Sequence, residues 1–116
     1  MLTPKKVDHF KRLVEERIAE LNRSIEAGQE QARVLATRHP DAMDQAAIEY
    51  ERQAALYKVT TDRQLRQTLT RTLERIHTGK FGECAECGAE IEQKRLEAIP
   101  WAQYCIKCQE AMEKEL

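Results

Sequence analysis

The first third of the chain decides the fold, and from residue 3 to residue 38 it reads TPKKVDHFKRLVEERIAELNRSIEAGQEQARVLATR. Apolar or small residues recur along one stripe of this segment about every 3.5 residues, which is the coiled-coil period. The stripe consists of Val7, Phe10, Val14, Ile18, Leu21, Ile25, Gly28, Ala32 and Leu35. Thr3 suits an N-cap and Pro4 suits the first helical position, so we predict one long helix over residues 3–38.

A break and a second helix follow this segment. Proline cannot continue the helical hydrogen bonds, and it disfavours the helical conformation at the preceding residue, so His39-Pro40-Asp41 should end the first helix. A second helix is predicted from residue 44 or 45 to His77, with Gly79 as its C-terminal capping glycine. Its apolar face is made of Ile48, Ala55, Leu56, Val59, Leu65, Leu69, Leu73 and Ile76. Two long helices joined by a few residues predict an antiparallel coiled-coil hairpin over residues 1–79, with its tip at residues 39–45.

Composition narrows the class of protein. The 116 residues include 34% charged side chains and six aromatic ones, with few glycines and prolines, which favours an elongated helical protein over a β-sandwich. No apolar run is long enough for a membrane span. The N-terminal lysines are not followed by the apolar segment of a secretory signal, so we expect a reducing, cytoplasmic location and no membrane partner.

Charge is nearly balanced overall but is divided along the chain. The formal net charge is −1, which argues against the general basic field of a nucleic-acid-binding protein. Residues 1–38 and 46–78 each carry +2, residues 39–45 carry −2 from Asp41 and Asp44, and residues 79–116 carry −3. The predicted tip is therefore acidic and lies between two mildly basic arms.

The four cysteines carry the strongest chemical signal. They form two CxxC pairs, Cys84 with Cys87 and Cys105 with Cys108, separated by 17 residues. Each pair can present two thiolates from a tight turn, and four thiolates complete a closed tetrahedron around one Zn²⁺ ion. A closed set of ligands predicts a structural zinc site, with Gly88 in a turn that needs positive φ. The alternatives are two disulfides, unbound thiols, or a redox pair.

These features together predict a protein dominated by α-helices. A four-cysteine zinc-finger domain with a short final helix, from about Ile106 to Leu116, should occupy residues 80–116 and follow the hairpin of residues 1–79. No combination of nucleophile and base, phosphate-binding loop or paired catalytic acids is visible, so we do not expect an enzyme.

Several segments together resemble the DksA/TraR family of bacterial transcription factors. The first is FGECAECG at residues 81–88, which is followed by RLEAIP at residues 95–100 and by the second CxxC pair. The segment Asp41-Ala-Met-Asp44-Gln-Ala46 also matches the family's D-x-x-D-x-A tip motif. The resemblance covers nearly the whole chain, and these motifs stand at the family's spacing on a helical hairpin.

The resemblance implies both a partner and a mode of action. Family members bind RNA polymerase, insert the coiled coil into its secondary channel and alter the stability of promoter complexes. Carried over to this sequence, it implies that Asp41, Asp44 and Ala46 are the tip residues that act on the polymerase. It also implies that all four cysteines are zinc ligands.

Three positions depart from the pattern of the members that respond to the nucleotide ppGpp. Where those members carry basic residues, this sequence has Thr68, Ile99 and Gln109. We therefore expect weak or no dependence on ppGpp.

Other interpretations of these features stay open from the sequence. Asp44 is also a suitable N-cap for the second helix, and Asp41 a suitable turn residue after Pro40. A DNA-binding zinc finger and a thiol redox switch are the alternative functions, although the acidic C-terminal segment argues against direct DNA binding. A hairpin whose helices pair with each other predicts a monomer.

Overall fold

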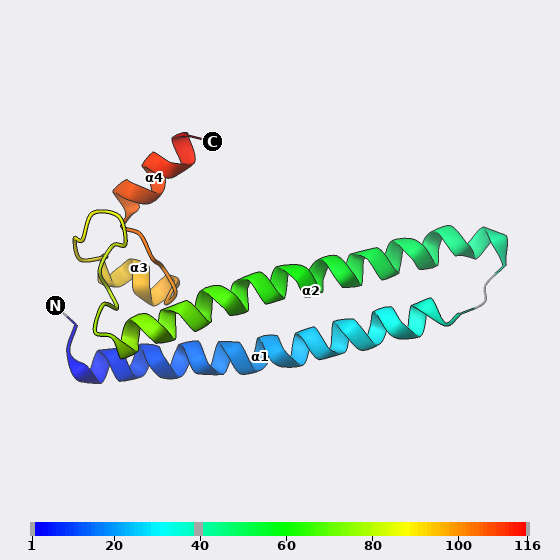
Figure 1. Ribbon diagram of the computed structural model, residues 1–116, viewed down its shortest axis with the longest axis horizontal. Helices are drawn as coiled ribbons and strands as arrows, with labels where there is room; N and C mark the ends of the chain where they lie inside the picture. The colour runs from blue at the N-terminus through cyan, green and yellow to red at the C-terminus, as the bar shows by residue number, and fades with distance from the viewer. Residues whose placement is uncertain (1, 39–40, 116) are drawn as a thin grey trace. The chain divides into compact units, whose positions relative to one another are not determined.

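The computed structural model describes residues 2–38 and 41–115, except for the side chains of Ala42 and Met43. Four helices follow one another along these residues: α1 (Pro4–Ala36), α2 (Ala42–His77), α3 (Gln93–Ala98) and α4 (Ile106–Lys114) (Figure 1). In the described residues the only extended pairing is an isolated antiparallel bridge between Glu83 and Glu90. The predicted helical class, an N-terminal helical hairpin followed by a cysteine cluster and a final helix, is confirmed. Within the same residues, no helix combines the length and apolar character that crossing a membrane requires.

The observed helix ends differ slightly from the predicted ones. At the start of α1 the Lys6 backbone N–H donates to Thr3 Oγ1 at 3.3 Å, as expected of an N-cap. At the other end, the N–H groups of residues 37 and 38 donate to the carbonyls three residues earlier, so the last turn tightens and α1 stops at Ala36. The predicted break at His39 and Pro40, and the predicted end of the last helix at Leu116, lie outside the described residues.

The second helix starts earlier than the sequence predicts. It begins at Ala42, so Asp44 lies inside the first turn and Asp41 precedes the helix. The interpretation of Asp44 as the N-cap is therefore wrong. Within its polar middle segment the helix is continuous, and the hydroxyls of Thr60 and Thr61 donate to the carbonyls of Leu56 and Tyr57, at 3.1 Å each. Carbonyl groups of the helix itself therefore accept hydrogen bonds from these two hydroxyls, and the polar segment does not interrupt the helix.

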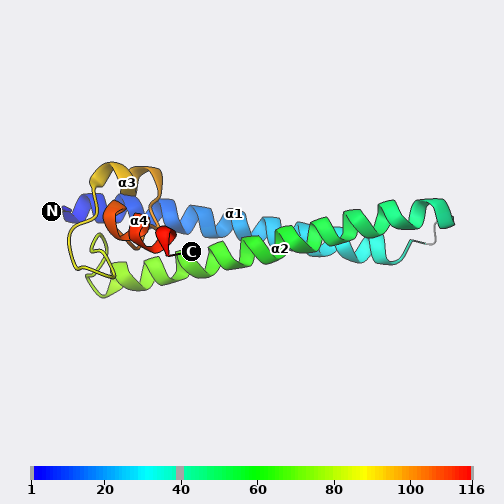
Figure 2. The same ribbon diagram turned by 90° about the horizontal axis from the view of Figure 1, so that it is seen from above.

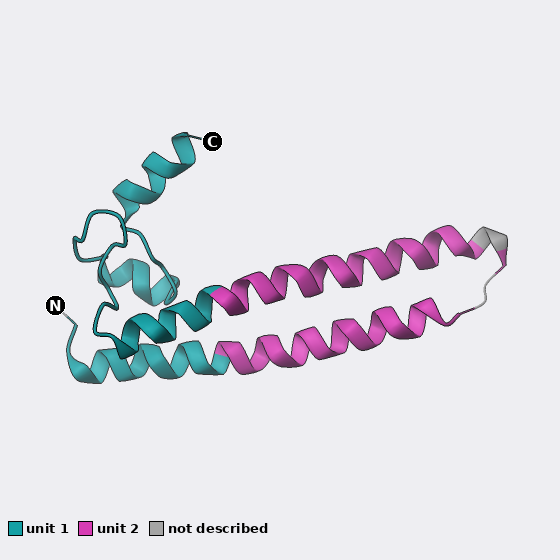
Figure 3. Cartoon of the chain, in the orientation of Figure 1, with its two compact units in different colours: residues 1–16, 68–116 teal, residues 17–67 magenta. Residues whose placement is uncertain are grey.

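The chain divides into two compact units, and both helices of the hairpin contribute to each unit (Figure 3). Unit 1 contains residues 1–16 and 68–116, and unit 2 contains residues 17–67. The domain boundary between residues 79 and 80, which rests on the change in sequence character, stays a prediction.

The predicted apolar stripes form the interior of these units. In unit 1, Phe10, Val14 and Leu69 are buried. In unit 2 the buried apolar residues come from both helices, and they are Leu21, Ile25, Ala32, Leu35, Ala55 and Val59. Leu56, which was predicted to lie on the apolar face of the second helix, is instead 39% exposed. It follows Ala55 directly, and the backbone rotation of about 100° per residue turns its side chain away from α1.

Polar contacts fix how α1 pairs with α2 in unit 2. Ser24 Oγ donates to Asp62 Oδ2 at 2.7 Å, Lys58 Nζ donates to Ser24 Oγ at 2.6 Å, and Arg66 Nη1 donates to Asn22 Oδ1 at 2.8 Å. Residue numbers rise along α1 as their partners' numbers fall along α2, so the pairing is antiparallel. The hydrogen bond from Ser24, with smaller contributions from Lys58, keeps the pKa of Asp62 below its usual value. These bonds lie where the apolar pattern of α2 lapses, and they hold the register there.

Gly28 lets the two helices approach closely. A Cβ atom at this position would lie 2.6 Å from Val59 Cγ2, which is shorter than any normal carbon–carbon contact. Val59 is buried and has a short, stiff side chain, so it has little freedom to move aside. A glycine inside a helix normally lowers stability, and here it is needed because the valine fills the space.

Replacing Gly28 tests this contact. We expect Gly28→Ala to lower the free energy of unfolding by about 1 kcal/mol, since overpacking against Val59 outweighs the gain in helix propensity. In a Val59→Ala background the same change should raise stability by about 0.5–1 kcal/mol, because the space is then open. Urea unfolding followed by circular dichroism measures both steps. A stabilising effect in the wild-type background would contradict the contact.

Candidate metal centre

The four cysteines gather into one cluster in unit 1. Their Sγ atoms all lie within 4.8 Å of one another, and the Sγ atoms of Cys87 and Cys105 are 3.8 Å apart. Four sulfurs placed ~2.3 Å from a zinc ion at the corners of a tetrahedron are separated by about 3.8 Å. Four thiols at this spacing match the donor set and size of a single structural zinc site, and they leave no position for a fifth ligand.

A tight turn positions the first pair of cysteines. Gly88 has a φ of +76°, a conformation that residues with a side chain rarely adopt, and its N–H donates to the carbonyl of Cys84 at 3.0 Å. The N–H of Cys84 in turn donates to the carbonyl of Ala89 at 2.7 Å. The chain therefore folds back on itself directly after Cys87, and both sulfurs of the pair face the same point.

The second pair is positioned by the start of α4. Cys105 is the N-cap residue of this helix, and its carbonyl accepts the N–H of Gln109 at 2.9 Å, so Cys108 lies in the first turn. A hydrogen bond from the N–H of Ala85 to the carbonyl of Gln103, at 2.8 Å, links the two cysteine segments. Figures 1 and 2 both show α3 next to the first turns of α1 and the last turns of α2, whereas α4 points away from these turns in Figure 1; all four segments belong to unit 1.

Two arginines that the sequence analysis did not single out hold the backbone of these segments. From the last turn of α2, Arg75 Nη2 donates to the carbonyl of Glu83 and, at 3.1 Å, to that of Lys80. From α3, Arg95 Nε donates to the carbonyl of Tyr104 at 3.0 Å. Each arginine thus reaches the residue directly before the first cysteine of a pair. The role of Arg75 could have been predicted from the sequence, because it lies one turn before the capping glycine Gly79, and basic side chains near the C-terminus of a helix bind its free carbonyls.

The cysteines are also part of a hydrophobic core. Cys84 and Cys105 are buried together with Phe10, Ile91 and Leu96. The rings of Phe10 and Phe81 lie 5.5 Å apart in a tilted arrangement. The short helix α3, which the sequence analysis missed, contributes Leu96, whose side chain is fully buried. Metal ligands and apolar residues therefore stabilise the same small interior.

The electrostatic environment makes the thiols unequal. Burial raises the pKa of Cys84, but the backbone N–H groups of Cys87, Cys105 and Glu86 point at its sulfur and bring the pKa down to about 6. The neighbouring sulfurs of Cys105 and Cys84, followed by burial, raise the pKa of Cys108 to about 12. A compact group of thiolates repels itself, so full ionisation of the cluster needs a cation at its centre.

The second predicted set of functional residues lies in unit 2. Asp41 directly precedes α2, and its carbonyl accepts the N–H of Asp44 at 2.9 Å. Asp41, Asp44 and Ala46 are all exposed. The structure thus brings the four cysteines together in one unit, and places the three tip residues close together in the other unit at the start of α2.

Comparisons with known proteins agree with this architecture. A family model described as the prokaryotic dksA/traR C4-type zinc finger matches residues 79–114. The protein named RNA polymerase-binding transcription factor DksA from Salmonella typhimurium is 34% identical over 113 residues, which cover 95% of this chain and 75% of that protein. Its counterpart in Escherichia coli is 33% identical over 111 residues, which cover 93% of this chain and 74% of the other.

Solved structures show the same likeness. Transcription factor DksA2 from Pseudomonas aeruginosa matches with a TM-score of 0.88 at 31% identity, over 97% of this chain and 86% of that one. The RNA polymerase binding protein and transcriptional regulator Dks from Chlamydia trachomatis matches with a TM-score of 0.61 at 26% identity, over 99% and 95% of the two chains. The fold and the cysteine cluster define a helical-hairpin protein with a C4-type zinc finger. The chain belongs to the DksA/TraR family, and its cofactor is one structural Zn²⁺ ion.

Removing one sulfur tests the metal centre. We expect Cys87→Ser and Cys105→Ser each to reduce the zinc content from about one ion per chain to nearly none, because a structural site depends on all four thiolates. Most of the helical signal of α1 and α2 should remain, while the structure of residues 80–115 is lost. Elemental analysis and circular dichroism measure these effects. The matched control is Ala85→Ser, an exposed position in the same turn, and unchanged zinc in a cysteine variant would mean that the ligands are misassigned.

Proposed function

We propose that this chain is a bacterial transcription regulator that binds RNA polymerase and inserts the tip of its hairpin into the secondary channel, where it changes the stability of promoter complexes. The observation that carries the proposal is a pair of exposed carboxylates, Asp41 and Asp44, at the point where a two-helix unit turns back. The names of the DksA relatives support the choice of partner.

The composition of unit 2 suits this role. It consists of α1 and α2 segments with their connection, and each helix with its side chains is about 10–12 Å wide. A pair of helices can enter a channel that would exclude a bulkier domain. Carboxylates at the leading end can pair with basic polymerase residues or interact with Mg²⁺ at the active site. Ala46, which has a small side chain, leaves room for a close approach at the same end.

The zinc-finger part has a supporting role in this proposal. A site closed by four sulfurs has no open position for a substrate, so we propose no reaction for the chain. Residues 79–116 carry a net charge of −3 before any contribution from thiolates, which opposes direct sequence-specific DNA binding. Polymerase as the partner implies a bacterial cytoplasmic location, and the self-paired hairpin implies a monomer.

We further propose that the regulator acts with weak or no dependence on ppGpp. All three positions that are basic in responsive family members carry uncharged side chains here, and the structure shows the surroundings of two of them. Ile99 is aliphatic and half-buried, and Gln109 Nε2 donates to Glu113 Oε1 at 3.2 Å. A phosphate group would therefore meet no cationic side chain at either position.

Neutralising the tip carboxylates tests the main proposal. We expect Asp44→Asn, and to a smaller degree Asp41→Asn, to abolish the effect of the protein on promoter-complex lifetime, because charge is lost while shape is kept. Affinity for polymerase should change by less than about threefold, since most of the contact surface is retained. Transcription in vitro and direct binding measure the two effects. Glu26→Gln, an exposed carboxylate on α1, is the control, and full activity of both tip variants would refute the proposal.

Adding the nucleotide tests the second proposal. At saturating ppGpp we expect the effect of the wild-type protein on a responsive promoter to change by less than about twofold, because the phosphate partners are missing. The same transcription assay with and without nucleotide measures this. The positive control is a family member that responds to ppGpp, tested in parallel reactions. Tight ppGpp binding by the complex of polymerase with the present chain would count against the proposal.

A further inference from the structure

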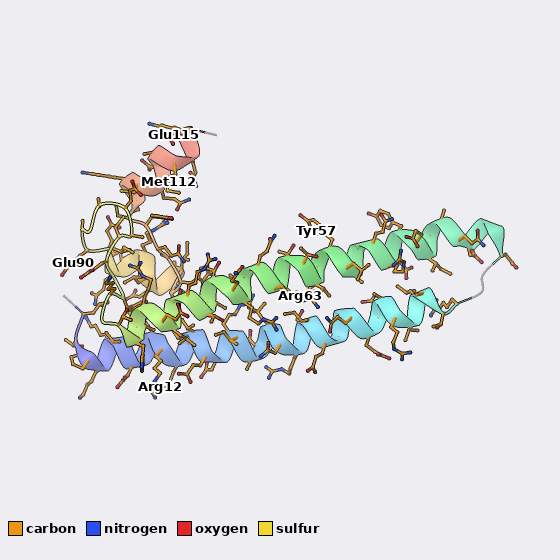
Figure 4. All side chains as sticks on the ribbon, viewed as in Figure 1. Arg12, Tyr57, Arg63, Glu90, Met112 and Glu115 are labelled. Atoms are coloured by element: carbon orange, nitrogen blue, oxygen red, sulfur yellow. The ribbon has the colours of Figure 1, made fainter. Side chains whose placement is uncertain are left out.

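One face of α2 in unit 2 has an unusual composition. We call it the tyrosine stripe, and it consists of Ala46, Tyr50, Gln53, Ala54, Tyr57 and Thr61, which recur at helical spacing. All six residues are exposed, and the two tyrosines are 77% and 75% exposed. Figure 4 shows Tyr57 projecting from α2 on the side away from α1. The stripe therefore lies opposite the buried residues Ala55 and Val59.

The lack of charge on the tyrosine stripe contrasts with the chain as a whole, in which charged residues make up 34%. Between residues 46 and 61, all of them described, the six positions of the stripe carry no Asp, Glu, Lys or Arg, and Glu49 lies at its edge, where its Oε1 atom accepts a hydrogen bond from Gln53 Nε2 at 3.2 Å. By contrast, the outer face of α1 in the same unit is charged, and its exposed residues include Arg23, Glu26, Glu30 and Arg33. Solvent exposure alone therefore does not explain a neutral stripe.

Two large aromatic side chains in solvent are typical of a protein-binding surface. Tyrosine offers a rigid ring and a hydroxyl, and it is enriched among the residues that dominate binding energy at interfaces. The rings of Tyr50 and Tyr57 are seven residues apart on one helix, or about 10 Å. A single-stranded nucleic acid would also stack on aromatic rings, but it needs cations on the same face, and the stripe has none within the described residues 46–61.

The position of the tyrosine stripe indicates its partner. It begins at Ala46, which is one of the three proposed tip residues, and it continues for about 22 Å along α2 to Thr61. A partner that receives the tip would therefore meet the stripe next. Because the stripe is neutral, the partner surface that matches it is also uncharged and offers hydrogen-bond acceptors to the two phenol groups.

We infer that the tyrosine stripe is a docking surface for an uncharged protein surface of RNA polymerase, which binds α2 along the side of the inserted hairpin. This inference rests on the proposed function and adds a binding surface to it. The acidic tip acts on the polymerase, whereas the stripe supplies affinity. Loss of the stripe should therefore weaken binding, and loss of the tip charge should not.

A matched pair of variants tests the inference on the whole, zinc-loaded chain. Ala54→Arg places a charge in the centre of the stripe, and Ala19→Arg places the same charge at an exposed alanine on α1 in the same unit. Both changes keep a good helix former. We expect Ala54→Arg to weaken binding to purified bacterial RNA polymerase roughly tenfold or more, and Ala19→Arg to change it less than about twofold. Tyr50→Ser combined with Tyr57→Ser should reproduce the loss.

The outcomes separate the inference from the proposed function. If the wild-type protein binds polymerase and Ala54→Arg binds equally well, the inference fails and the proposed function stands. If the wild-type protein does not bind polymerase, the proposed function fails and the inference fails with it. If sedimentation shows that the wild-type protein self-associates and Ala54→Arg does not, the stripe is an interface between two copies, which also overturns the inference. Circular dichroism of each variant checks that the hairpin is intact.

Discussion

The structure of unit 1 depends on the meeting of four sulfur atoms within 4.8 Å of one another. Two of these sulfurs belong to Cys84 and Cys105, which are also buried in the hydrophobic core with Leu96. A core this small cannot offset the conformational entropy of ordering two loops and two short helices. Binding of one zinc ion supplies the missing free energy, because the ion binds four chain positions that would otherwise separate.

Two arginines hold the backbone next to the metal centre by hydrogen bonds. Arg75 and Arg95 donate to carbonyls directly before Cys84 and Cys105, so each cysteine pair is approached by a chain segment held by a helix. The N–H groups that point at Cys84 favour its thiolate form. These bonds and the metal ion favour the same arrangement of the four sulfurs, so metal binding and folding of the cysteine segments stabilise each other.

In unit 2, polar contacts and one close helix contact fix the register of α1 against α2. Apolar burial is interrupted along α2, and there Ser24, Lys58 and Asp62 form a hydrogen-bonded group between the helices. The side chain of Asp62 is only 14% exposed, so removing a partner would leave a poorly solvated charge. Close contact at Gly28 and directional polar bonds together specify one alignment of α1 and α2, which simple apolar contact would not.

The sequence by itself determined the hairpin, the zinc-binding cysteines and the family, since helical periodicity, proline and glycine positions, and CxxC spacing are local signals. It did not predict α3, because six residues without a cap carry no readable period. The exposure of Leu56 also depended on packing. Only the tertiary structure decided that Arg75 and Arg95 bind the cysteine segments, and that the face of α2 with Tyr50 and Tyr57 stays exposed when α1 packs on the other side. These features depend on which side chains meet across the chain, and local sequence does not encode such distances.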